Sequence, residues 1–239
     1  MTILLMNSYL SIINYTSKPL EKISKILVTE TDKTSTPNDK ILFNHVNNMT
    51  VKLGFMMYAL DSIKHVNNKT LTINDVPSVY INYHLCNFIY CSKAFLDSVA
   101  VTLNYSFKLG FNGGSRDFNK SVFRETVTQK VSSNYDNYAT WINDVINWRD
   151  SLIHKLSTLI VPYMELGRDP TIQDLKANAL VKMPVEPIDV FPDLQTIKNL
   201  EKKYGYWIQE IEPFCEKWIN SAKDMFNDTC EVIMTSMSK

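Results

Sequence analysis

The 239-residue chain is poor in several residue types that mark common classes of functional site. Its six glycines are too few for the glycine-rich loops that cradle phosphates. Its four cysteines, Cys86, Cys91, Cys215 and Cys230, form no C-x-x-C pair, and a chain of this size needs no disulfide scaffold. We therefore expect reduced, mostly buried thiols. The four histidines are scattered, with no partner at metal-ligand spacing. The sequence predicts neither a metal nor a cofactor.

Charge and hydropathy exclude further classes. Lys plus Arg total 25 and so do Asp plus Glu, so the formal net charge is zero. This balance argues against a broad electrostatic binder of nucleic acid, although it leaves room for a local basic site. No window reaches the roughly 18 apolar residues that a membrane span needs. The apolar start of the chain lacks a basic region and a cleavage site of the secretory kind. We therefore expect a cytoplasmic protein without a membrane segment.

What the chain does contain is apolar residues at helical spacing, within a composition that is 45% hydrophobic. The stripes predict helices over 20–27, 42–63, 77–103, 118–127, 135–159 and 194–239. Ser115 is expected to cap the helix that carries Phe118 and Val127. Residues 29–40 are predicted to form a loop, and Pro213 is expected to kink or divide the last helix.

These helices predict an all-α, up-and-down bundle of about five or six helices, because each apolar stripe needs another for burial. No domain boundary is evident, so residues 1–239 are expected to form a single domain. The pattern changes over about 158–192, between the helix of 135–159 and the C-terminal helix. Within this excursion Thr158–Leu166 and Ala179–Val185 are short and rich in β-branched residues. They can pair as a small hairpin, which Pro162 and Pro184 would restrict to a sheet edge.

One segment combines residues suited to phosphate binding and proton transfer: Trp148-Arg149-Asp150-Ser151-Leu152-Ile153-His154. Arg149 occurs where the stripe of Ile142 and Val145 calls for an apolar side chain. A charged group at such a position must be paired, reach water along its stem or lie at an interface. Its planar fork matches phosphate geometry. Asp150 and His154 are four residues apart, so the carboxylate can orient the imidazole and raise its pKa for acid–base work.

The spacing of Arg149 and His154 poses a geometric difficulty. Five residues correspond to about 140° around an ideal helix, so one straight helix does not bring the two together. The long Arg side chain, a local kink, or a second copy of the helix across a two-fold axis would each close this gap. The last option predicts a homodimer with a shared site.

Structural interpretations of the same residues remain open. Arg149 can bridge to an acid on a neighbouring helix, and His154 can stabilise a helix C-terminus. The basic residues Lys120, Arg124 and Lys130 on the preceding helix can form a solvated face.

The segment Arg149-Asp150 followed by His154, late in a long helix, resembles the R-x(4–6)-H motif of the HEPN superfamily, in which the residue after Arg is commonly Asn, Asp or His. The helix with Ser92-Lys93-Ala94-Phe95-Leu96-Asp97 and Asn104 is similar to the helix that packs against the motif helix in some bacterial HEPN-like proteins. The resemblance covers about residues 82–159.

This resemblance implies a metal-independent endoribonuclease that acts as a homodimer through the helix carrying Arg149 and His154. Arg149 would hold the scissile phosphate, His154 would act as general base on the 2′-OH or as acid on the leaving oxygen, and Asp150 would orient the site. Ser151 and Lys155 would contact the RNA. Many members are toxins, with an antitoxin as partner, or defence proteins. Others are inactive helical modules that bind a nucleotide or a protein, and this alternative stays open.

Overall fold

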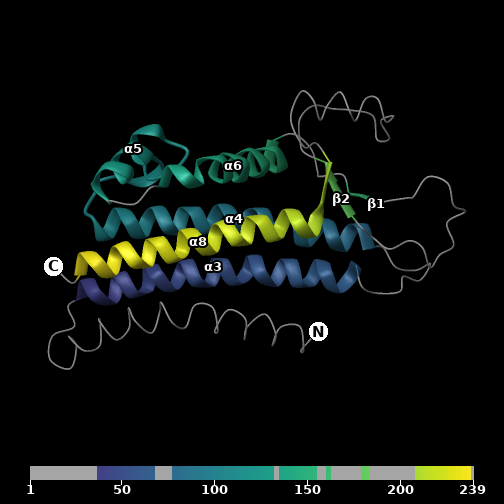
Figure 1. Ribbon diagram of the computed structural model, residues 1–239, viewed down its shortest axis with the longest axis horizontal. Helices are drawn as coiled ribbons and strands as arrows, with labels where there is room; N and C mark the ends of the chain where they lie inside the picture. Colours follow the sequence, from purple (N-terminus) through teal and green to yellow (C-terminus); the bar gives the residue numbers. More distant parts are fainter. Residues whose placement is uncertain are drawn as a thin grey trace, which may run out of the picture.

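The computed structural model describes residues 37–67, 77–131, 135–154, 160–162, 179–182 and 208–237. Its described α-helices form an all-α bundle, as the sequence predicts (Figure 1). Three long helices lie side by side: α3 (Pro37–Asn67), α4 (Pro77–Ser106) and α8 (Ile211–Met237). The shorter α5 (Ser121–Lys130) and α6 (Ala139–His154) lie over α4. The expected helix over 20–27 lies outside the described residues.

The apolar stripes of α3 and α4 form most of the interface between these helices. Both helices begin with proline, whose fixed φ suits a first helical position where no N–H partner is needed. α3 therefore starts inside the predicted loop of residues 29–40. Every apolar residue of the two predicted stripes is buried, with exposed fractions of 8% or less: Leu42, Val46, Met49, Leu53, Met56, Leu60 and Ile63 on α3, and Leu85, Phe88, Ile89, Phe95, Leu96, Val99 and Leu103 on α4.

The polypeptide between α4 and α6 differs from the prediction at its start. Ser115 does not cap a helix carrying Phe118. It closes a 3-10 turn, η1 (Gly113–Ser115), where its Oγ donates to the Asn112 carbonyl at 2.6 Å. α5 begins only at Ser121, after Lys120, whose side chain provides no cap. The segment around Phe118 is thus a loop, and its ring is buried as an anchor. A second 3-10 turn, η2 (Tyr135–Tyr138), precedes α6.

Three short strands form an antiparallel sheet at one end of the bundle: β1 (Ile160–Pro162), β2 (Ala179–Lys182) and β3 (Ile208–Glu210). β1 and β2 come from the two segments considered for a hairpin, with Val161 opposite Leu180. β3 pairs with β2 and lies inside the predicted helix of 194–239, so the helical prediction is wrong at 208–210. Pro213 falls in the first turn of α8, where it needs no kink.

Candidate functional site

Two tryptophans fix α6 against the bundle. Trp141 lies 6.3 Å from the Phe95 ring of α4, and Trp148 lies 5.1 Å from the Phe214 ring of α8. Trp141 retains 6% exposure and Trp148 only 1%. These contacts set the rotation of the helix. Arg149, the next residue, lines a groove beside the loop that follows α4.

Arg149 shares a helical side with Ile142 and Val145, as the stripe predicts, yet its side chain is 38% exposed. The apolar seam is open at this turn, where a groove and the loop with Arg116 and Asp117 lie beside Arg149. The Arg149 Nη1 donates to Asp150 Oδ1 at 2.8 Å. Of the options predicted for a charge at this position, pairing and contact with water both apply.

The groove beside Arg149 lies between α4, the loop after η1 and α6, and has a volume of about 380 Å³. It is open to solvent along one side and is large enough for a phosphate with part of its sugar. Its walls are formed by Lys93, Asp97 and Val101 from α4, Gly113 and Gly114 from η1, Arg116, Asp117 and Asn119 from the loop after it, and Ile146, Arg149 and Asp150 from α6.

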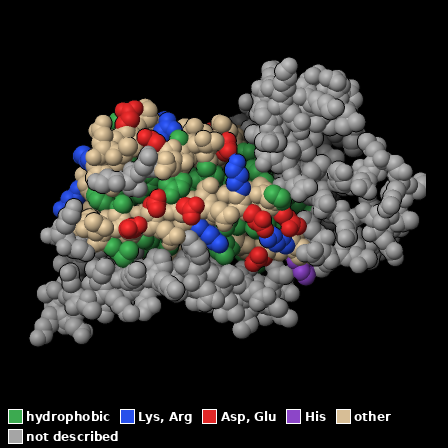
Figure 2. Space-filling model, in the orientation of Figure 1, with side chains coloured by type: hydrophobic (Ala, Val, Ile, Leu, Met, Phe, Trp, Pro, Cys, Tyr) green, Lys and Arg blue, Asp and Glu red, His purple; other side chains and the backbone are tan. Residues whose placement is uncertain are grey.

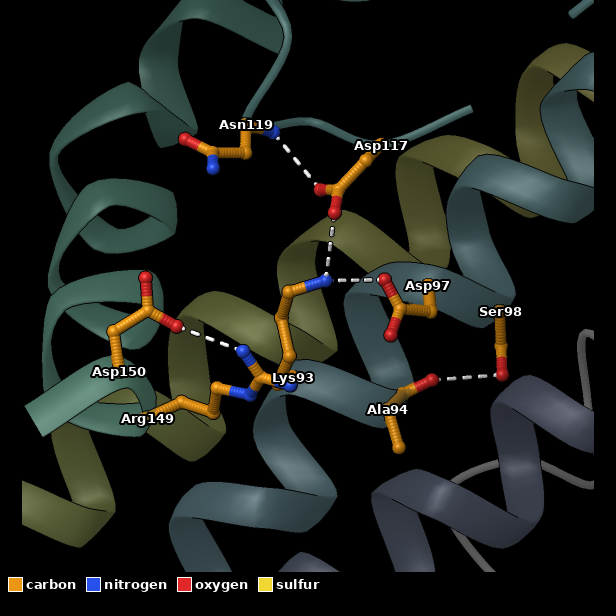
Figure 3. Close-up of polar contacts among 8 residues, drawn as sticks. All are labelled: Lys93, Ala94, Asp97, Ser98, Asp117, Asn119, Arg149 and Asp150. Atoms are coloured by element: carbon orange, nitrogen blue, oxygen red, sulfur yellow. Dashed lines mark hydrogen bonds and ion pairs between the residues drawn. The ribbon is translucent and has the colours of Figure 1, made fainter. Parts of the chain in front are cut away.

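Lys93 connects two walls of this groove (Figure 3). Its Nζ forms ion pairs with Asp97 on the same helix and, at 3.1 Å, with Asp117 Oδ2 in the loop. Asp117 Oδ1 also accepts from the Asn119 backbone N–H at 2.9 Å. Only 14% of the Lys93 side chain is exposed. The ammonium therefore acts first as a structural link that holds the loop to α4.

Asn104 holds the start of the same loop. Its side-chain amide donates to the Phe111 carbonyl at 3.1 Å, and its oxygen accepts from the Phe111 N–H at 2.9 Å. Gly110 and Gly113 have φ of 84° and 50°, a region that favours glycine, on either side of this contact. The loop that forms one wall of the groove is thus fixed at both ends.

Arg116 differs from the other two cations of the groove. Within the described part of the chain no carboxylate forms an ion pair with it, whereas Lys93 and Arg149 are both paired. Arg116 also affects the nearby His45. Burial lowers the pKa of the His45 imidazole, and the positive charge of Arg116 lowers it further. Among the described residues, an anion that binds Arg116 therefore has no carboxylate to displace, unlike one that binds Lys93 or Arg149.

The charges that line the groove balance. Lys93, Arg116 and Arg149 face Asp97, Asp117 and Asp150, so the formal sum is zero. Acidic and basic side chains are also interspersed on the face of the molecule that Figure 2 shows, without a continuous basic band. A bound anion would be held by local geometry and hydrogen bonds more than by a broad field.

The remaining predicted site residues lie at the end of α6. Only the backbone is described for residues 151–154, so the side chains of Ser151 and His154 lie outside the description, as does Lys155. α6 continues without a break through Arg149 and His154, and their positions are about 140° apart around it. The expected contact of Asp150 with His154 stays a prediction. The contact observed for Asp150 is with Arg149.

The basic residues before α6 do not reach the groove. Lys120 and Lys130 are exposed, and Arg124 donates to Asn143 Oδ1 at 3.4 Å beside a separate depression between α5 and η2. The cations that line the groove with Arg149 are Lys93 and Arg116 instead. The family resemblance includes Lys93 only as part of a similar helix, and no sequence spacing links it to Asp117, which lies 24 residues away.

Comparisons of the chain with models of protein families, with curated proteins and with solved structures find no significant match. Among the described residues, no cluster of three or more His, Cys, Asp or Glu side chains is arranged to hold a metal ion. None of the helices in the described ranges combines the length and apolar character needed to cross a bilayer.

Proposed function

We propose that this chain is a HEPN-like endoribonuclease whose substrate phosphate binds in the groove between α4, the 113–119 loop and α6. The observation that carries the proposal is the position of Arg149: a guanidinium on the motif helix lines an open groove, together with Arg116 from the loop. A stability role alone does not require that opening. A cytoplasmic location and a toxin or defence role, with an antitoxin as partner, belong to the same proposal.

Arg149 and Arg116 are the groups suited to the phosphate. Guanidinium groups donate in pairs to phosphate oxygens, and Arg116 forms no ion pair with a carboxylate of the described residues. Arg149 must exchange its bond with Asp150 for one with the phosphate. Since both side chains of this pair are partly exposed, at 38% and 48%, the exchange costs little. Charge that develops on the phosphorane oxygens would then be stabilised.

His154 would move the protons. As a base it would take the proton of the ribose 2′-OH, whose oxygen attacks phosphorus while the bond to the 5′-oxygen breaks. The leaving oxygen takes up a proton, and the products are a 2′,3′-cyclic phosphate and a 5′-OH. Because the described helix is unbroken between Arg149 and His154, we favour a site shared across a two-fold axis, in which each motif helix supplies one of the two residues.

The proposal is tested by RNA cleavage in EDTA by wild type, His154→Ala and Arg149→Ala. Both variants are expected to lose at least about 100-fold in rate, the usual contribution of a general acid–base group or an oxyanion donor. Arg124→Ala is the matched control, because Arg124 lies on α5 outside the groove. No cleavage by wild type, or equal cleavage by all four proteins, would reject the catalytic assignment.

A second candidate is a catalytically inactive module that binds a nucleotide or a protein. The charge balance of the groove favours it, because Lys93 and Arg149 are both neutralised by carboxylates of their own chain. This candidate predicts that AMP or a short RNA binds in the groove and remains intact, with Arg116→Ala weakening the binding.

A further inference from the structure

The solvent-facing side of α4 continues the wall of the groove toward the N-terminus of the helix. Lys93, Asp97 and Val101, which line the groove, recur at intervals of three or four residues. The same spacing extends upstream to Tyr90, Cys86, Tyr83 and Val79, so all seven positions share one side of the helix. A nucleic-acid strand that leaves the groove along α4 would therefore contact these residues next.

α4 exposes three tyrosines, of which Tyr83 and Tyr90 lie on this side and Tyr80 lies about 60° from Tyr83 around the helix. Tyr83 is 64% exposed, Tyr80 43% and Tyr90 42%, whereas large aromatic side chains are usually more deeply buried. Seven residues separate Tyr83 from Tyr90, which corresponds to about 10 Å along the helix. Tyr90 lies about 5 Å along the axis from Lys93. Tyr83 and Tyr90 are thus far enough apart to contact different bases of one extended strand, with Tyr90 nearer the groove.

Two of the rings are held by a buried imidazole. His84, 6% exposed, lies 4.3 Å from the Tyr80 ring and 5.2 Å from the Tyr83 ring, the latter in an edge contact. Tyr58 of α3 contacts the same imidazole edge-on at 6.2 Å. The rings are fixed at one edge while much of their surface stays in water. A ligand that stacks on them loses less side-chain entropy than on free rings.

The chemistry of this stretch suits nucleobases. From Pro77 to Ser92, α4 carries no Asp, Glu, Lys or Arg, so no carboxylate of this segment repels a polyanion. Stacking on aromatic rings beside a cationic site for the backbone is the usual arrangement of proteins that bind single strands. The groove offers two guanidinium groups for the backbone, at Arg116 and Arg149.

We propose that Tyr80, Tyr83 and Tyr90 form a stacking platform for the bases of single-stranded RNA, continuous with the phosphate site at Arg149. This inference rests on the proposed function, because the groove determines which ligand reaches the platform. It specifies the substrate class as a single strand that extends for several nucleotides beyond the cleaved bond.

The test is the binding of a fluorescein-labelled 12-nucleotide single-stranded RNA, made non-cleavable by 2′-O-methylation, followed by anisotropy. Tyr83→Ala and Tyr90→Ala are each expected to raise Kd about tenfold, and the Tyr→Phe changes to raise it less than about twofold, because the ring does the stacking. Val122→Ala, which shortens an apolar side chain of α5 that is 62% exposed, is the matched control.

Cleavage of a dinucleotide and of the unmodified 12-mer separates the two proposals. The platform predicts that Tyr83→Ala raises KM for the 12-mer and leaves dinucleotide cleavage unchanged. If the Tyr→Ala variants weaken RNA binding but no protein cleaves RNA, the stacking platform is supported and the nuclease proposal is rejected. If neither Tyr→Ala variant changes RNA cleavage or RNA binding, the platform is rejected and the nuclease proposal is not. Loss of self-association in these variants, with RNA affinity intact, identifies a protein interface and overturns the platform.

Discussion

Arg149 and Asp150 are neighbours in the sequence and partners in the structure, with the Arg149 Nη1 2.8 Å from Asp150 Oδ1 at the edge of the α4–α6 groove. The carboxylate neutralises the guanidinium in the free protein. A phosphate that enters the groove must compete with this carboxylate, so Asp150 sets the affinity of Arg149 for anions.

The change Asp150→Asn removes that competition and keeps the shape of the side chain. We expect the Kd for a non-cleavable single-stranded RNA to fall several-fold. The free energy of unfolding should change by less than about 1 kcal/mol, since the pair is partly exposed. Anisotropy and thermal melting measure the two quantities. Asp136→Asn, at an exposed position outside the groove, is the control. Weaker RNA binding by Asp150→Asn would contradict this role.

A shared site has a consequence for mixtures of inactive subunits. When Arg149→Ala and His154→Ala proteins are unfolded and refolded together, half of the dimers are mixed. Each mixed dimer then has one site with both residues intact. Cleavage should return to about a quarter of the wild-type rate if Arg149 and His154 act from opposite subunits. A mixture that stays as inactive as its components places both residues in one subunit or in none.

The His84 imidazole makes stability depend on pH. Burial among the tyrosine rings lowers its pKa below the ordinary 6.5, and burial does the same for His45, with Arg116 adding to it. The unfolded chain thus binds protons that the folded chain does not. The free energy of unfolding must therefore fall as pH drops below about 6.5, until the folded-state pKa values are passed.

Urea unfolding at pH 7.5, 6.5 and 5.5 measures this effect. His84→Gln should flatten the decline, whereas His65→Gln, at an exposed position near the end of α3, should not. If the free energy of unfolding depends on pH in the same way in wild type and His84→Gln, His84 does not cause the decline.

Trp148 is the main apolar anchor next to the site. It is 1% exposed and contacts Phe214, so truncation leaves a cavity between α6 and α8. We expect Trp148→Ala to cost about 3–5 kcal/mol in the free energy of unfolding. Trp148→Phe should recover much of this loss. Denaturant melts give the values, and a cost below about 1 kcal/mol would mean that α6 is held by other contacts.

The thiols provide an independent check of the core. Cys215 and Cys230 are buried at 0% and 1% exposure, and burial raises the pKa of both, that of Cys230 to about 12. Neither should react with a thiol reagent in the native state, because the reactive form is the thiolate. Mass spectrometry after brief labelling of the native protein should find both cysteines unmodified. After denaturation, both should be labelled. Fast native labelling of Cys215 would contradict the packing of α8.

The sequence predicts the bundle well because helical burial is periodic. The stripes of α3 and α4 are buried at every predicted position from Leu42 to Leu103, as 3.6-residue spacing requires. The same reasoning fails at Ile208–Glu210, where pairing with β2 overrides a helical pattern. It also fails at Ser115, whose hydroxyl bonds to the Asn112 carbonyl in a turn of its own.

The site is predictable only in part. Helical spacing places Arg149 in the seam, but whether a seam is closed depends on what packs against it, and here that is the loop held by Asn104 and Lys93. Contacts such as that of Lys93 with Asp117 join residues whose separation carries no local pattern. They follow from the tertiary fold and were not predicted.

The most direct measurement of the central claim uses an oligodeoxynucleotide with a single internal ribonucleotide, incubated with the protein in EDTA. We expect one cut, immediately 3′ of the ribose, that leaves a 2′,3′-cyclic phosphate and a 5′-OH, and we expect Arg149→Ala and His154→Ala each to abolish it. An intact oligonucleotide, or a cut that persists in both variants, would contradict the account.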